Sequence, residues 1–135
     1  MTGSMQVEVL GLAHAPSAPG TNEIADLCRA AAASAGLSDG HLAVEFVDAA
    51  RIAQLNEAHR GKPGPTDVLS FPIDGLQAQE GVERELGDVI ICPEHTVDLR
   101  EAIVHGVLHL LGMDHETDEG QMLAAQAEIL ASARA

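Results

Sequence analysis

Three histidines late in the chain have a spacing that suits a metal ion. His105, His109 and His115 fall within eleven residues. His105 and His109 are four positions apart, so on a helix their side chains lie on one face, about one turn apart. Two imidazoles placed in this way can bind a single zinc ion at about 2.0–2.1 Å per Zn–N bond.

His115 can join this pair only if the helix ends before it. A continuing helix would carry His115 about 9 Å beyond His109 along the axis. Gly112 lies between the two, and glycine readily adopts the left-handed conformation that ends helices. We therefore expect two ligands on a helix, a turn at Gly112, and a third ligand that returns to the same ion. Three protein ligands leave the fourth tetrahedral position open, which is typical of catalytic zinc.

The residue after the first histidine argues against a peptidase. The spacing of the three histidines and Gly112 matches that of the metzincin proteases, in which a glutamate follows the first histidine and acts as general base. Here that residue is Gly106, which has no side chain. Peptide hydrolysis by that mechanism is disfavoured. Zinc, or nickel or another divalent metal that imidazole also suits, can still activate water.

The metal motif and two further segments resemble the bacterial YbeY family. The sequence HGVLHLLGMDH at 105–115 is similar to the family's HGxLHLxGxDH. Two further segments also resemble segments of the family and occur in the same order. They are Arg60 and Gly61 followed by PTDVLSFP at 65–72, and LGDVIIC at 86–92. The resemblance runs from about residue 44 to the end of the chain. One departure is visible, because only twelve residues separate Cys92 from His105, where the family often carries an additional helix.

The resemblance implies a zinc-dependent, single-strand-specific endoribonuclease. It implies action in ribosomal RNA maturation, at the 3′ end of 16S rRNA, and in ribosome quality control. The implied partners are ribosomal RNA and the small ribosomal subunit or its proteins. The implied cofactor is one Zn²⁺ ion held by His105, His109 and His115.

Arg60 is the candidate catalytic side chain. It precedes an irregular loop, and a planar guanidinium suits a phosphate or a pentavalent transition state. The alternative for Arg60 is a surface salt bridge. Asp114, Ser70 and Thr66 are candidates for contacts to substrate or to a metal ligand, and Asp114 could equally be a turn residue after Gly112.

Two other functions remain open. The net charge of −14 opposes general affinity for RNA, because phosphate binding is largely electrostatic, although Arg51, Arg60 and Lys62 form a local basic group. A metal-dependent hydrolase of another substrate is therefore one alternative. A non-catalytic ribosome-assembly factor, in which the metal only stabilises the fold, is the other.

The composition predicts one globular domain over residues 1–135, with 1–4 as a disordered start or a cloning remnant. Hydrophobic residues make up 46% of the sequence, enough for a core. Neither a signal peptide nor an apolar stretch of about 18–20 residues is present, so we expect no membrane association. The separated Cys28 and Cys92 suggest a reducing compartment, and we expect a cytoplasmic protein. The sequence does not indicate an oligomeric state.

Hydrophobic periodicity and breaker residues place the elements that must position the histidines. Strands are expected at 6–10, 41–47, 67–71 and 86–92. Helices are expected at 22–35, 49–59, from 96 or 98 to 111, and at 118–132, with irregular loops at 62–65 and 76–84. This order predicts an α+β fold in which a single small mixed β-sheet is packed with helices. The family resemblance implies a zincin-like arrangement with the metal helix against the sheet.

Overall fold

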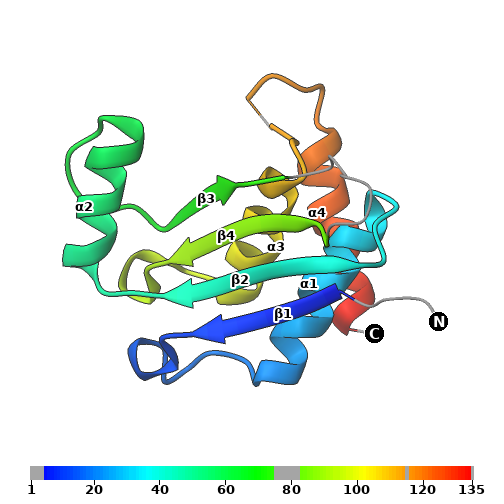
Figure 1. Cartoon of the computed structure of the whole chain (residues 1–135), viewed down its shortest axis with the longest axis horizontal. Helices are drawn as coiled ribbons and strands as arrows, with labels where there is room; N and C mark the ends of the chain where they lie inside the picture. Colours follow the sequence, from blue (N-terminus) through cyan, green and yellow to red (C-terminus); the bar gives the residue numbers. More distant parts are fainter. Residues whose placement is uncertain (1–4, 75–82, 115, 135) are drawn as a thin grey trace.

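The protein is described by a computed structural model that covers residues 5–74, 83–114 and 116–134 (Figure 1). Four strands form a single sheet: β1 (Met5–Leu10), β2 (Gly40–Phe46), β3 (Val68–Pro72) and β4 (Glu85–Ile91), in the order β1-β2-β4-β3. The strands β1, β2 and β4 are parallel, and β3 pairs with β4 in the antiparallel direction. The expectation of one mixed sheet is therefore confirmed.

Three helices cover one face of this sheet. They are α1 (Thr21–Ser34), α3 (Leu99–Leu110) and α4 (Gln121–Arg134), which lie together behind the strands in Figure 1. Their apolar side chains form the larger core with the inward residues of the strands, among them Val44, Phe46, Val89 and Leu108. The buried side chains are mostly aliphatic, because the sequence has only two phenylalanines and no tryptophan or tyrosine.

The remaining helix, α2 (Ala49–Arg60), covers part of the opposite face. It contributes Ile52 to a smaller core that also contains Val47, Leu69, Ile90 and Cys92. Side chains alternate between the two faces along a strand, so Leu69 faces α2 while its neighbours Val68 and Ser70 face α3. The edge strand β3 therefore lies between the helix that carries Arg60 and the helix that carries the two histidines.

Local signals explain where the helices begin and end. Asp48 and Asp98 accept hydrogen bonds from the backbone N–H groups of Arg51 and Glu101, at 2.8 and 3.2 Å, and so cap α2 and α3. Gly61 ends α2 in the left-handed conformation, with φ 68°. The predicted strands and helices are all present, with ends shifted by up to three residues. Residues 1–4 and most of the expected loop at 76–84 lie outside the described residues.

Two of the connections contain a short 3-10 turn, η1 (Leu12–His14) and η2 (Pro93–His95). The second one lies in the segment between β4 and α3. Cys28 and Cys92 are both buried and free, and burial raises the pKa of the Cys28 thiol to about 12. Within the ranges that the structure describes, no helix has the length and apolar character needed to cross a membrane.

Candidate metal centre

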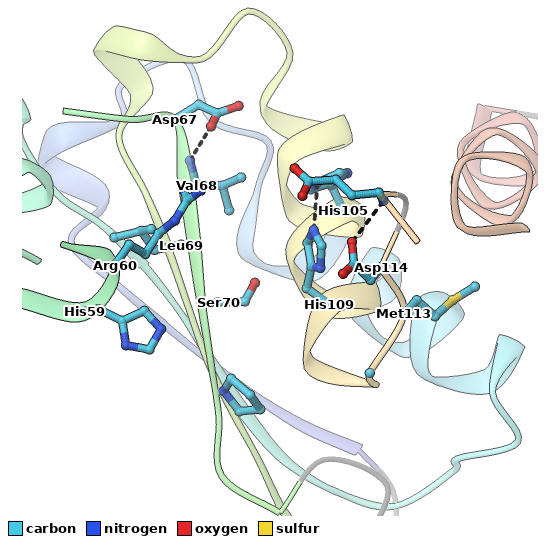
Figure 2. A pocket seen from close by; sticks show the side chains of 13 residues that line it. His59, Arg60, Asp67, Val68, Leu69, Ser70, His105, His109, Met113 and Asp114 are labelled. Carbon is cyan, nitrogen blue, oxygen red and sulfur yellow. Dashed lines mark hydrogen bonds between the residues drawn. The ribbon is translucent and has the colours of Figure 1, made fainter. Parts of the chain in front are cut away.

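The two histidines of α3 face one another at metal-binding distance. His105 Nε2 and His109 Nε2 are 3.1 Å apart, and the rings meet edge to face with centroids 4.7 Å apart (Figure 2). Two ligand nitrogens on one tetrahedral zinc ion, each about 2.0–2.1 Å from the metal, would be separated by about 3.3 Å. The pair thus has the donor atoms and the spacing that one divalent ion requires.

The helix ends where the sequence predicts a turn. Gly112 has φ 91°, its N–H donates to His109 O at 3.0 Å, and Met113 N–H donates to Leu108 O at 3.1 Å. These bonds close the last turn of α3 and redirect the chain. The expected third ligand, His115, lies outside the described residues. Among residues 5–74, 83–114 and 116–134, no group of three His, Cys, Asp or Glu side chains is placed to hold a metal.

A glutamine on α4 holds the first histidine and was not anticipated from the sequence. Gln126 Oε1 lies 2.8 Å from His105 Nδ1, and the glutamine is 8% exposed. Met122 and Leu130, four residues before and after it, are also buried. A polar residue within the apolar stripe of a helix is the signal that could have identified it, since such residues are usually buried for a specific partner.

Gly106 is glycine because α3 lies against the sheet at this point. A Cβ atom added at Gly106 would lie 2.4 Å from Val89 Cγ1 and 3.3 Å from Val68 Cγ2. Ser70 Oγ also donates a hydrogen bond to Gly106 O at 2.9 Å. The position at which a peptidase of the H-E-x-x-H type carries its glutamate therefore has no room for any side chain. That peptidase mechanism is therefore disfavoured on steric grounds as well.

The two histidines line a cavity of about 680 Å³ together with several other candidates. Arg60, Ser70 and Asp114 line it as well, and the full lining is His59, Arg60, Asp67, Val68, Leu69, Ser70, Pro72, His105, His109, Gly112, Met113, Asp114 and Glu116. Thr66 is outside this set, and its hydroxyl contacts Asp67 Oδ1 at 3.3 Å. Asp114 Oδ1 accepts from Glu116 N–H at 2.9 Å, which is the turn geometry that was one of its two interpretations.

Arg60 reaches the cavity from the other side of the edge strand. Figure 2 shows Arg60 and His59 on one side of β3 and His105 and His109 on the other. The His59 ring packs against the Phe71 ring in a tilted arrangement, with ring centroids 4.3 Å apart. In the part of the chain that the structure describes, Arg60 takes no part in an ion pair, and it is the only lysine or arginine among the residues that line the cavity.

The loop after α2 is anchored beside Arg60. Asn56 is 4% exposed, and its Nδ2 donates to Gly64 O at 3.0 Å, which holds the loop that follows Gly61. This contact ties the last turn of α2 to the segment that leads into β3. The backbone is therefore held on both sides of Gly61, next to Arg60.

Comparisons with known proteins agree with the motifs. The family described as "Endoribonuclease YbeY" matches residues 17–134 of the chain. The protein of that name from Nocardioides sp. is 40% identical over 70% of this chain and 75% of its own. The one from Rubrobacter xylanophilus is 36% identical over 96% of each chain. A Thermotoga maritima protein whose solution structure is known is 26% identical, with 95% of this chain and 89% of that chain covered, and a TM-score of 0.54.

Proposed function

The chain belongs to the YbeY endoribonuclease family, and we infer from this premise that it is an endoribonuclease of ribosomal RNA maturation that uses a divalent metal ion. The observation that supports a bound metal ion is the pair of imidazole nitrogens 3.1 Å apart on α3, which line the same cavity as Arg60. We propose that His105, His109 and His115 hold one ion and that Zn²⁺ is the first candidate.

The side chains around the histidine pair have different roles in the proposed reaction. A divalent ion bound there supplies a Lewis acid that makes water nucleophilic at neutral pH. Gln126 orients His105, and Ser70 fixes α3 against the edge strand through Gly106 O. Arg60 offers a planar donor that can bind a phosphate oxygen and counter the negative charge that grows on it during cleavage.

The shape and charge of the cavity support a substrate with a flexible backbone. The cavity is bounded by the edge strand, with Arg60 on one side and the histidines on the other. A single RNA strand can bend around such an edge, whereas a rigid duplex would have to meet both walls at once. We therefore propose single-stranded ribosomal RNA as the substrate, with cleavage near the 3′ end of 16S rRNA as the family resemblance implies.

The net charge of −14 disfavours tight binding to the ribosome through RNA phosphates alone. We propose that the small ribosomal subunit or its proteins supply a docking contact, and that the protein acts in the cytoplasm. The zincin-like arrangement is part of the same proposal, since it requires His115 to return to the pair on α3.

The test compares RNA cleavage by four samples of the full chain: the parent, the parent treated with chelator, the same sample with Zn²⁺ restored, and His109→Ala. A labelled ribosomal RNA fragment is offered single-stranded or annealed to its complement. We expect cleavage of the single strand by the parent and by the restored sample only. A zinc-loaded parent that leaves both RNAs intact would contradict the proposal, and hydrolysis of a small ester or peptide instead would favour a different hydrolase.

A further inference from the structure

The most unusual residue of α4 is Gln126. The buried face of this helix is otherwise made of apolar side chains, with Met122, Ile129 and Leu130 each 8% exposed or less. Gln126 occupies a position on the same face and is 8% exposed. A buried amide stabilises the fold poorly unless it is hydrogen-bonded, and an apolar residue of similar size would satisfy the core better. A specific partner is therefore needed to explain a glutamine here.

The partner is Nδ1 of His105, the ring nitrogen that does not contact His109. Gln126 Oε1 lies 2.8 Å from His105 Nδ1. An amide oxygen can only accept, so His105 Nδ1 carries the proton and His105 Nε2 carries a lone pair. That lone pair faces His109 Nε2, 3.1 Å away, and a hydrogen bond between these two atoms then requires His109 to donate.

We propose that Gln126 is a positioning residue that keeps His105 in the Nδ1-protonated tautomer, so that Nε2 is ready to bind a divalent metal ion. This inference rests on the proposed function of the histidine pair. Without an acceptor at Gln126, His105 could place its proton on Nε2 and donate it to His109 Nε2, and His105 Nε2 would then have no lone pair for a metal. The other ring nitrogen of a ligating histidine usually meets such an acceptor, which fixes the tautomer and the ring orientation.

The tautomer of His105 can be measured directly on metal-free protein. Long-range ¹⁵N–¹H spectra of the full chain at about pH 8, above the ordinary pKa of histidine, distinguish protonated from bare ring nitrogens. We expect a bare Nε2 on His105 in the parent and in Gln126→Glu, which keeps an acceptor. In Gln126→Leu, which has a similar volume and no acceptor, we expect the proton to move to Nε2 in a large fraction of molecules.

The second measurement is the affinity for Zn²⁺ alone, by competition with a chromophoric chelator. Loss of such an orienting partner typically weakens metal binding about 10- to 100-fold, and we expect a loss in that range for Gln126→Leu. Gln126→Glu should bind Zn²⁺ at least as tightly as the parent. Leu130→Ala is the matched control, because it removes buried packing from the same helix without removing a polar group. It should lower the melting temperature and leave the zinc affinity unchanged.

Two results would overturn the positioning role. One is a parent in which His105 carries its proton on Nε2, since the amide of Gln126 would then be turned the other way. The other is a Gln126→Leu protein with the tautomer and the zinc affinity of the parent. Failure of the proposed function has a different signature, because the zinc-loaded parent would then leave RNA intact while the tautomer of His105 still responded to Gln126.

Discussion

Substitution of Arg60 shows whether the cavity catalyses a reaction at a phosphate. It is the only lysine or arginine in the cavity lining among the described residues, and it is not part of the buried core. Loss of one preorganised group of this kind typically costs on the order of 10²–10³ in rate. We expect Arg60→Ala to lose RNA cleavage by about that factor, and Arg60→Lys to recover part of it, because a point charge lacks the bidentate geometry.

The measurements for Arg60→Ala are cleavage rate, bound zinc and melting temperature. Bound zinc and melting temperature should match the parent, since Arg60 is exposed on the last turn of α2. Lys62→Ala is the matched control, because Lys62 is an exposed cation two residues away and does not line the cavity. Cleavage by Arg60→Ala at the rate of Lys62→Ala would show that the guanidinium has no catalytic part.

Substitution of His109 shows whether the histidine pair on α3 binds a metal ion. We expect protein purified without added metal to hold about one divalent ion per chain and His109→Ala to hold almost none, because the ion would lose one of three ligands. Elemental analysis of both proteins measures this directly. The control is His95→Ala, an exposed histidine of η2. If His109→Ala and His95→Ala carried equal metal, the assignment of the α3 pair would be wrong.

At the scale of elements, Gly106 sets how closely α3 approaches the sheet. Alanine is a better helix former than glycine by about 1 kcal/mol. Its Cβ would nevertheless lie 2.4 Å from Val89 Cγ1, and overpacking of this kind costs about 1–3 kcal/mol. We expect Gly106→Ala to lower the free energy of unfolding measured in urea.

A double-mutant cycle identifies the cause of that loss. In a Val89→Ala background the two clashing methyl groups are gone, so Gly106→Ala should cost less there than in the parent, or should stabilise the protein. An equal cost in both backgrounds would mean that the loss does not come from contact with Val89.

The elements themselves were largely predictable, because their signals are local. Asp48 and Gly61 mark the ends of α2 through a side-chain cap and a left-handed turn that depend only on neighbouring residues. The order of the strands and the antiparallel direction of β3 depend on contacts between distant segments, which periodicity does not encode. The position of α2 on the face opposite α3 could not be foreseen for the same reason.

In the candidate site, too, the features that depend on local sequence were predictable and those that depend on tertiary packing were not. The spacing of His105 and His109 follows from helix geometry, and their Nε2 atoms do meet. Gln126 is 21 residues beyond His105, and only the packing of α4 on α3 brings the two together. The placement of Ser70 against Gly106 O likewise depends on β3 lying at the edge of the sheet beside α3.

At the scale of the whole molecule, His41 links stability to pH. Its Nδ1 lies 2.7 Å from Glu85 Oε2, and its Nε2 lies 3.5 Å from Glu8 Oε1, so it connects β1, β2 and β4. The hydrogen bond to Glu85 raises the pKa of His41 above its ordinary value; partial burial opposes this, and the charges of Glu85, Glu8 and Glu83 add to it. The protonated imidazole therefore stabilises the folded state.

The sign of the effect follows from the raised pKa. The contribution of His41 is fully present below about pH 6.5, the value in the unfolded chain, and is lost as pH rises through the folded pKa. We expect His41→Gln to reduce the free energy of unfolding more at about pH 5.5 than at about pH 9, as measured by urea denaturation at both values. His95→Gln, with an exposed histidine, is the control. An equal reduction by His41→Gln at both pH values would exclude this linkage.

The contact between Gly106 and Val89 also constrains how the site could change during evolution. A single substitution that placed a glutamate after His105 would drive a long side chain into Val89 of the sheet and so cost stability. Space would have to appear on β4 first, through loss of the Val89 methyl groups, before α3 could accept the new residue. The steps toward a peptidase therefore have a fixed order, and the first of them brings no catalytic benefit.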